Sequence, residues 1–438
     1  MRKALICLEQ LGIGGVETFT VTQVEEFARR GIKCFVMAKD GPLSKRFKDN
    51  KLIEFIEFDF ELKNEIDFEK VKKIEKVIKK HRIDFMYVHQ FPCIQYVLPC
   101  AFRLHIPYVA YLHNGIPGTI DWYSNYVSIY RSLFPIYFNN ASKIIAISDK
   151  VKKENQELFH LPDDKYMVVK NSISFSEYPD IDIKLPKKYK NISWIGRTSK
   201  EKKGSIIGAV EFYRWVKENY NPQAKLTIVG DGNLLDEIKE TYKDEDIIFR
   251  GAVADIKPEI KKADIILGMG RCVIEGMASK KPSIICGYNE HVCLISPRTI
   301  DKCMNENFAG HTLEDNKREV FDYTNEEMEK IIEDNYQYIK EKLSISNSIF
   351  LDIEEFPNKF DFEYFLEDMN RNAKDWDRLQ ELNYLIKEEN VFITDEVGRL
   401  VDTKKWKFLD IIANIGLKIN RIKGRKIRWI IQKNQDKH

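Results

Sequence analysis

The feature of this 438-residue sequence that most constrains its fold is a regular alternation of short apolar runs with amphipathic segments. The first unit reads KALICLE, a glycine-rich turn, the amphipathic stretch TVTQVEEFARR, and then IKCFVMA. Apolar runs of strand length that alternate with helices predict βαβ units, and therefore parallel strands joined by right-handed crossovers. The alternation continues to about residue 172, so this part is expected to form one open α/β domain.

A second series of the same kind begins near residue 191. Its predicted strands are NISWIG, KLTIVG, DIIFRG, ADIILGM and PSIICG. Between the two series, residues 173–190 hold two prolines, mixed charges and no sustained period, which is typical of a linker. We therefore predict Rossmann-like domains over 1–172 and 191–345, with an extension over 346–438. In tandem α/β domains, binding chemistry lies at the carboxyl ends of the strands, here facing each other across a cleft.

Composition supports a globular protein with more than one domain. The chain is longer than one ordinary core accommodates, and 43% of its residues are hydrophobic. Its eight cysteines lie in apolar segments without a C-x-x-C pair, which favours free thiols in a reducing cytosol over a zinc or disulfide framework. The first residues do not read as a signal peptide, and no apolar run reaches the ~20 residues of a spanning helix.

A glycine loop follows the first predicted strand. Gly12, Gly14 and Gly15 precede a helix, so their backbone N–H groups can approach an anion at the positive helix end. A dinucleotide fingerprint requires a third glycine where this chain has Glu17, and only Asp40 at the end of the second strand favours an NAD site. The remaining alternative to an anion site is that the glycines only allow the chain to make a tight turn.

The second series carries the stronger signal for phosphate. In NISWIGRTSKEKKG, Gly196 and Arg197 follow the strand directly, and Lys203 lies where the next helix begins. A guanidinium and an ammonium at a helix N-terminus predict a diphosphate site, although a lysine cluster is more often a solvated loop. Further along, Gly232 ends another strand, and the backbone at Val253 is placed to meet a base edge.

Together these segments resemble the retaining family 4 glycosyltransferases of the GT-B fold. The resemblance covers GGVE, GRTSKEKKG, IVGDGN, FRGAV and ADIILGMGRCVIEGMASKKPSII, within residues 1 to about 310. It implies two Rossmann-like domains across a cleft and transfer, most simply of a hexose, from a nucleotide sugar to a glycan or lipid-linked acceptor. Members of this kind act in bacterial surface-polysaccharide or glycolipid assembly.

The resemblance also implies roles for individual residues. Arg197 and Lys203 would bind the donor diphosphate, Gly14 and Gly15 would approach the donor from the opposite domain, and Glu275 would bind the ribose. The histidine of YLHNG, His113, would contact the donor sugar. The alternative is that its hydrogen bonds are made within the strand-end turn and that it has no functional role.

One position departs from the family pattern. The family often carries a glutamate pair spaced E-x7-E, and Leu267 stands at the first of these positions. The strand-to-helix turn there contains Gly270 and Arg271, whose backbone N–H groups and guanidinium can still hold a sugar or phosphate. The identity of the donor is therefore left open.

The expected mechanism needs no metal and no cofactor. Departure of a nucleoside diphosphate builds negative charge that preorganised cations stabilise. The D-x-D at Asp180 and Asp182 lies in the linker and is typical of a solvated loop, so the sequence shows no convincing metal-ligand spacing. Retention by same-face attack assigns no residue as nucleophile or general base.

The end of the chain differs in charge from the rest. Residues 403–438 hold eight Lys and three Arg against two Asp, and apolar positions from Phe408 to Ile422 recur at helical spacing. We expect residues 404–433 to form a basic amphipathic segment for an anionic membrane surface, on a cytoplasmic protein. A helix packed on the domain body is the alternative, and no nucleic-acid partner is expected.

Two other functions remain open from the sequence. One is a nucleotide-sugar epimerase on the same architecture, which requires an acid/base carboxylate in the cleft that the sequence does not identify. The other is a non-catalytic nucleotide-sugar-binding protein that has lost chemistry at Leu267.

Overall fold

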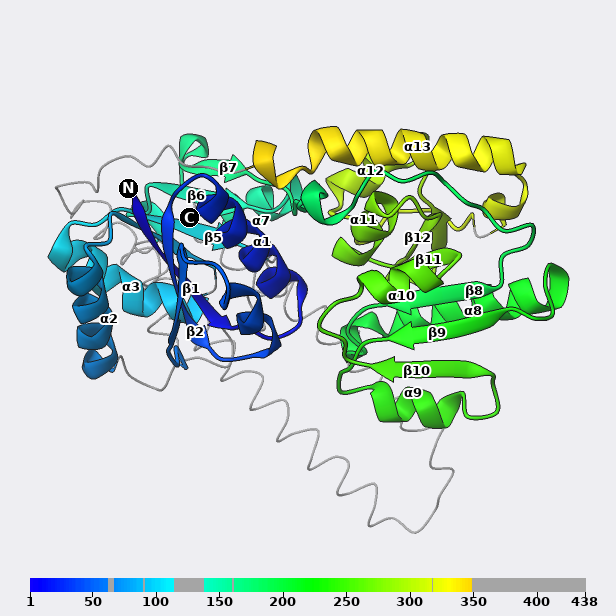
Figure 1. Cartoon of the computed structure of the whole chain (residues 1–438), viewed down its shortest axis with the longest axis horizontal. Helices are drawn as coiled ribbons and strands as arrows, with labels where there is room; N and C mark the ends of the chain where they lie inside the picture. Colours follow the sequence, from blue (N-terminus) through cyan, green and yellow to red (C-terminus); the bar gives the residue numbers. More distant parts are fainter. Residues whose placement is uncertain (62–66, 90, 114–137, 160, 317, 349–438) are drawn as a thin grey trace, which may run out of the picture. The chain divides into compact units, whose positions relative to one another are not determined.

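The computed structural model shows one compact unit, Met1–Phe365, that contains two α/β halves (Figure 1). The described residues are 1–61, 67–89, 91–113, 138–159, 161–316 and 318–348. A second unit, Leu366–His438, lies outside them, as does the predicted amphipathic segment 404–433. No helix among the described residues is long and apolar enough to cross a membrane.

The first half is a seven-stranded parallel sheet in the order β3-β2-β1-β4-β5-β6-β7. Its strands are β1 (Lys3–Gln10), β2 (Lys33–Lys39), β3 (Ile53–Glu57), β4 (Phe85–Val88), β5 (Tyr108–Leu112), β6 (Lys143–Ala146) and β7 (Tyr166–Val168). Its helices are α1 (Gly15–Arg29), α2 (Phe68–His81), α3 (Phe91–Leu104) and α7 (Asp149–Phe159). Strand β1 is an interior strand between β2 and β4, so the glycine loop that follows it opens within the carboxyl edge and not at its end.

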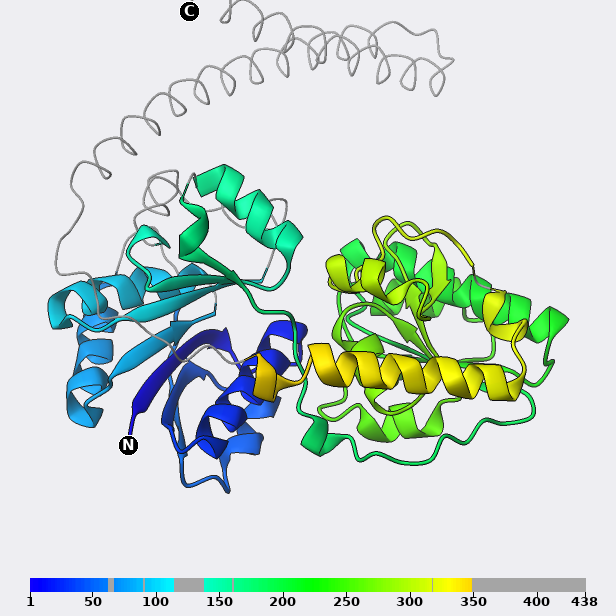
Figure 2. The ribbon, with the colours of Figure 1, turned by 90° about the horizontal axis from the view of Figure 1, so that it is seen from above.

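Both faces of this sheet are covered, which explains why its central strands are apolar without alternation. Residues Ala4 to Leu8 of β1 are all buried. Helices α2, α3 and α7 pack on one face, whereas α1 and the short 3-10 helix η1 (Pro42–Phe47) pack on the other (Figure 2). Parallel sheets require this double cover, because a strand with helices on both sides has no solvent face.

The second half is a six-stranded sheet in the order β10-β9-β8-β11-β12-β13. Its strands are β8 (Asn191–Ile195), β9 (Lys225–Val229), β10 (Ile247–Gly251), β11 (Ile265–Gly268), β12 (Ser283–Cys286) and β13 (Val292–Leu294). Its helices are α8 (Lys203–Asn219), α9 (Leu235–Thr241), α10 (Lys257–Lys262), α11 (Arg271–Ala278), α12 (Ile300–Asn305) and α13 (Asn325–Lys342). Strand β13 is antiparallel to β12, and every other pair is parallel.

The predicted fold class, two Rossmann-like α/β halves, is confirmed. Two strands, β3 and β13, are not predicted by the sequence pattern. Strand β3 is an edge strand whose sequence IEFIE mixes charge with apolar residues, and β13 is only three residues long. Both therefore lack the continuous apolar run that marks the central strands.

The chain passes between the halves twice. It leaves the first sheet near Ile173 and returns after α13, where Ile173 and Ser344 form a parallel bridge. After this bridge Ile345 packs into the first half's core beside α1. Figure 2 shows α13 running from the second half back to this point. The first half is thus completed by residues that come after the whole second sheet.

Candidate active site

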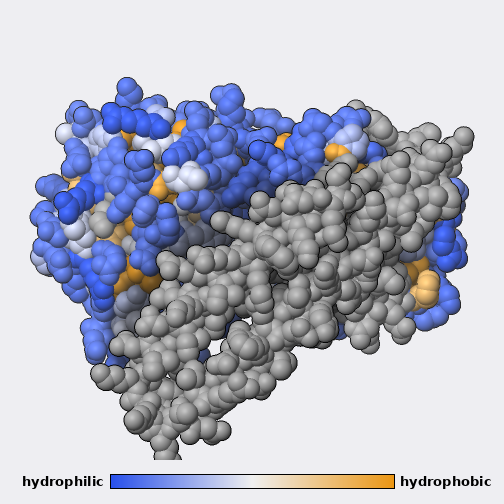
Figure 3. Space-filling model, turned by 180° about the vertical axis from the view of Figure 1, so that it is seen from behind, coloured by the Kyte–Doolittle hydropathy of each residue, from blue (hydrophilic) through white to orange (hydrophobic). Residues whose placement is uncertain are grey.

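A cavity of about 700 Å³ lies between the carboxyl edges of the two sheets. Ten of the residues selected from the sequence line it: Gly14, Gly15, His113, Gly196, Arg197, Gly232, Val253, Gly270, Arg271 and Glu275. They come from six separate strand-end segments, which the two sheets bring to one place. Figure 3 shows a polar surface over most of the described residues on one face, with small scattered apolar patches.

Two cations mark one wall of the cavity. Arg197 follows β8 and is exposed, and Lys202 is the N-cap of α8. Neither forms an ion pair with a carboxylate of the described residues, although Glu201 is nearby. Burial lowers the pKa of the Lys202 ammonium, and the Arg197 guanidinium lowers it further. Two neighbouring cations that lack a paired carboxylate among the described residues have the chemistry to hold an anion with more than one charge.

Lys203, the lysine selected from the sequence, does not line this cavity. Its side chain is exposed, and its Nζ lies 2.9 Å from Oε1 of Glu237 on α9. The reason is helical geometry, since successive helical residues point about 100° apart. Lys202 therefore faces the cavity, and Lys203 faces the neighbouring helix.

Tight glycine turns bring the backbone of the second half close to the cavity. A Cβ on Gly230 would lie 1.8 Å from the carbonyl oxygen of Gly196, so the loops after β8 and β9 approach closely only because this residue is glycine. Gly270 has φ 67° and ψ −130°, a conformation nearly restricted to glycine. The turn before α11 thereby places Met269 and Gly270 in the cavity wall, with the N–H of Gly270 donating to the Phe308 carbonyl at 2.8 Å.

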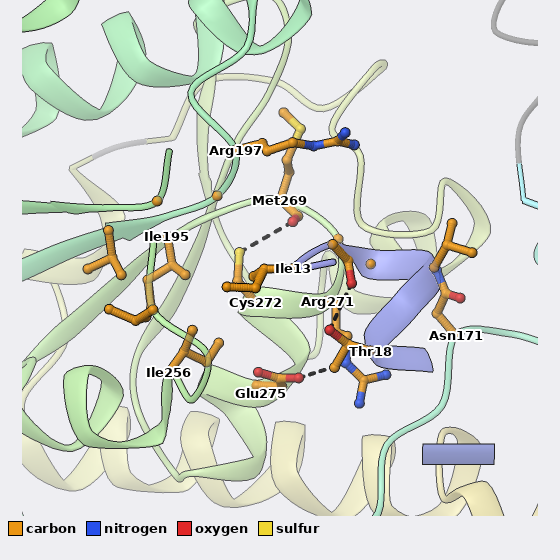
Figure 4. A pocket seen from close by; sticks show the side chains of 18 of the residues that line it. Ile13, Thr18, Asn171, Ile195, Arg197, Ile256, Met269, Arg271, Cys272 and Glu275 are labelled. Carbon is orange, nitrogen blue, oxygen red and sulfur yellow. Dashed lines mark hydrogen bonds and ion pairs between the residues drawn. The ribbon is translucent and has the colours of Figure 1, made fainter. Parts of the chain in front are cut away.

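Arg271 and Glu275 form a buried pair on α11 (dashed line, Figure 4). Nε of Arg271 donates to Oε1 of Glu275 at 2.7 Å, while its other nitrogens donate to the carbonyl oxygen of Ser172 at 2.8 Å and to Oγ1 of Thr22 at 3.0 Å. Burial raises the pKa of Glu275, and Arg271 opposes that shift. Arg271 thus ties the second half to α1, and Oε2 of Glu275 makes no hydrogen bond with a described residue.

The wall from the first half is largely uncharged. Gly14 and Gly15 begin α1, and Thr18 Oγ1 donates to the Gly14 carbonyl at 2.7 Å, which secures that first turn. His113 follows β5, and burial lowers its pKa to about 3. At neutral pH it therefore faces the cavity as a neutral imidazole.

Comparison with known proteins agrees with this geometry. Residues 13–177 match Glycosyltransferase Family 4, and residues 189–300 match Glycosyl transferases group 1. The chain belongs to the family 4 glycosyltransferases. The two matched segments correspond to the two sheets, and the cavity lies between them.

Solved glycosyltransferases share the fold. HepE of Anabaena, crystallised with UDP and glucose, aligns with a TM-score of 0.57 and 14% identity over 79% of this chain and 97% of its own. A glycosyltransferase of Rickettsia africae gives 0.55 and 15% identity over 78% and 94% of the two chains. A curated relative, an uncharacterized glycosyltransferase of Methanocaldococcus jannaschii, is 24% identical over 41% of this chain and about half (51%) of its own length.

Several cavity residues of this glycosyltransferase had no signal in the sequence. Glu177 Oε1 lies 2.7 Å from Arg46 of the first half, and its Oε2 lies 2.6 Å from Lys257 of α10. Arg46 is also paired with Glu25 of α1. These residues are far apart in the chain, so only the assembled fold reveals them. Lys202 belongs to the lysine cluster of the sequence, but the sequence does not show that its side chain faces the cavity.

The structure shows where Leu267 lies, the residue that departs from the family's glutamate pair. Its side chain is fully buried in the second half's core and does not line the cavity. Among the described residues, no group of three or more His, Cys, Asp or Glu side chains is arranged to hold a metal ion.

Proposed function

We propose that this protein is a retaining hexosyltransferase that moves a sugar from a nucleoside diphosphate to a hydroxyl of a glycan or lipid-linked acceptor. The observation that carries the proposal is the pair Arg197 and Lys202, cations without a paired carboxylate among the described residues. They face the glycine turn at Gly14 and Gly15 across a cavity with room for a nucleotide sugar. An anionic diphosphate satisfies both cations at once.

The reaction follows from the placement of these charges. The bond from the sugar's anomeric carbon to the β-phosphate oxygen breaks, and a bond to the acceptor oxygen forms on the same face. The leaving phosphate takes the acceptor's proton, so the protein supplies neither a nucleophile nor a base. Arg197 and Lys202 stabilise the negative charge that grows on the diphosphate as the bond breaks. These two cations make a metal ion or a cofactor unnecessary in this proposal.

We assign the nucleoside to the second half. The free Oε2 of Glu275 is available to accept a ribose hydroxyl while Oε1 stays with Arg271. The backbone around Val253 lines the same cavity and is suited to the base edge. Structures of HepE contain UDP-glucose, which favours a uridine donor and a hexose here.

We also propose a kind of acceptor and a cellular setting, both from the sequence pattern of the last part of the chain. The segment 404–433 lies outside the described residues, and its basic amphipathic pattern favours contact with an anionic cytoplasmic leaflet that carries a lipid-linked acceptor. Co-sedimentation with anionic vesicles, compared with neutral phosphatidylcholine vesicles, tests this part. Equal binding to both would contradict it.

Ligand-induced stabilisation tests the nucleotide site directly. Purified protein is heated with UDP, GDP, CDP, ADP, uridine or NAD. Binding at ~100 times the dissociation constant adds about 2.7 kcal/mol to the free energy of unfolding. We expect UDP to raise the melting temperature and uridine to raise it much less, because uridine lacks the diphosphate that Arg197 and Lys202 bind.

Three outcomes would change the proposal. Stabilisation by NAD alone would remove the nucleotide-sugar site. UDP binding without turnover over a broad donor and acceptor panel would favour a binding protein. Conversion of the sugar nucleotide to its epimer without an acceptor would favour the epimerase, which the glycosyltransferase relatives do not support.

A further inference from the structure

Two histidines meet at the carboxyl edge of the first sheet. His89 follows β4 and His113 follows β5, and these strands are parallel neighbours with Val88 opposite Ala110. Nδ1 of His89 lies 3.2 Å from Nε2 of His113. The backbone N–H of His89 donates to the Cys7 carbonyl at 3.0 Å, so its position is fixed to β1.

Aromatic rings hold both imidazoles in orientation. Tyr111 stacks on His89 at 4.5 Å between centroids and 21° between planes, and on His113 at 5.7 Å and 17°. Phe19 of α1 packs edge-on against both histidines. The Tyr111 hydroxyl accepts a hydrogen bond from Gln23 at 2.5 Å, which secures the stack from the side of α1. These contacts pack against both rings.

The two histidines are neutral together. His89 is 1% exposed, and burial lowers its pKa well below the usual value, with His113 adding to the shift. Two charged imidazoles 3.2 Å apart in a desolvated site would repel strongly. A neutral imidazole has one N–H and one lone pair, so one ring donates and the other accepts.

Only one arrangement avoids a buried N–H without a partner. If His113 donates from Nε2, then His89 must carry its own proton on Nε2, which is buried without a partner among the described residues. If His89 donates from Nδ1, the buried Nε2 is only a lone pair. Unpaired buried N–H groups are rarer in proteins than unpaired acceptors, which favours the second arrangement.

We propose that His89 is a positioning residue that donates its Nδ1–H to His113 Nε2 and so fixes the proton of His113 on Nδ1. Nδ1 is the nitrogen of His113 left for a ligand, since Nε2 is occupied by His89. His113 then meets the donor sugar as a hydrogen-bond donor to a hydroxyl oxygen. It cannot serve as a base from that nitrogen. This inference rests on the proposed function only for the identity of the ligand.

The tautomers are measured without any assay of activity. In protein labelled with ¹⁵N at its eight histidines, long-range proton–nitrogen spectra distinguish an N–H nitrogen from one with a lone pair. The signals of His89 and His113 are assigned by their loss in His89→Phe and His113→Phe. We expect both histidines of the native protein to be protonated on Nδ1. A proton on Nε2 of His113 would overturn the proposal.

Three variants of His89 separate positioning from packing. The amide nitrogen of Asn replaces Nδ1 and can still donate to His113, that of Gln replaces Nε2, and Phe retains the stacked ring without a donor. We expect kcat to fall roughly tenfold in His89→Phe and His89→Gln, an effect typical of residues that orient a functional ligand, and much less in His89→Asn. Stabilisation by UDP should be unchanged in all three, because His113 contacts the sugar and not the nucleotide.

The outcomes separate the two proposals. Equal loss of kcat in His89→Asn and His89→Phe, with unfolding free energies lowered alike, would show that His89 only packs, and would overturn the positioning role. If the tautomers are as expected but no nucleotide sugar is consumed, the proposed function fails and the tautomer assignment stands.

Discussion

The two walls of the cavity use opposite electrostatics. The second half contributes Arg197 and Lys202, which carry charge and have no paired carboxylate among the described residues. The first half contributes His113, which is held neutral by burial together with its neighbour His89, and Arg46, whose charge is already paired with Glu25 and Glu177. Under the proposed function, charge recognition and hydroxyl recognition are therefore assigned to separate sheets. A diphosphate needs compensation of charge, whereas a sugar needs hydrogen bonds of fixed direction.

Removing the exposed cation should have the largest effect. Arg197→Ala should lower turnover by about 10²–10³, comparable with the loss of one oxyanion-hole donor, because the departing diphosphate loses a guanidinium. Steady-state kinetics with the nucleotide sugar identified by stabilisation measures it. Lys200→Ala, at an exposed residue of the same loop that does not line the cavity, is the matched control. A folded Arg197→Ala enzyme with full activity would remove Arg197 from the mechanism.

The turn that presents the second wall depends on one glycine. Gly270→Ala should lower the free energy of unfolding by roughly 1–3 kcal/mol from backbone strain alone, since a Cβ there meets no atom within 4 Å. Gly15→Ala is the control: its Cβ is equally free of contacts, and Ala is favoured in a helix. Urea denaturation should separate the two, and equal stabilities would show that the turn at Gly270 adapts without strain.

The choice between neighbouring lysines sharpens the comparison further. Lys202→Ala should weaken UDP binding by about 1.5 kcal/mol, the low end for hydrogen bonds to charged groups. Lys203→Ala should leave UDP binding nearly unchanged, since the Lys203 side chain pairs with Glu237 and does not line the cavity. Titration calorimetry with UDP measures both. The reverse ranking would restore the role that the sequence predicted for Lys203.

The neutral wall predicts a dependence of stability on pH. The folded-state pKa values of His89 and His113 lie below the ordinary 6.5, so only the unfolded chain takes up these protons as the pH falls below 6.5. Each histidine should then cost about 1 kcal/mol over the first pH unit below 6.5, and nothing above it. The free energy of unfolding of the wild type and of His89→Phe is measured by denaturation at about pH 7.5 and about pH 5.5. Carboxyl groups titrate alike in the two proteins, so the difference between them isolates the contribution of His89. Parallel curves for the two proteins would contradict it.

The sequence predicted the two sheets well, because strands buried on both faces have continuous apolar runs, as in β1 and β8. Most cavity residues were also predictable, since strand ends in parallel sheets meet at one edge. The sequence could not show which of Lys202 and Lys203 lines the cavity, because this depends on the direction of one residue at a helix start. The Arg46–Glu177–Lys257 cluster and the partner of His113 were beyond reach, because each joins residues that only the assembled fold brings together.

The return of the chain to the first half affects how the protein is made. Ile345 completes the core beside α1, and the bridge between Ile173 and Ser344 pairs the two passages of the chain. At ribosomal rates of 5–20 residues per second, the first sheet emerges roughly 10–30 s before its last core residue. During that interval the cleft-facing edge of this sheet and the apolar site where Ile345 will pack are open to chaperones and to other nascent chains.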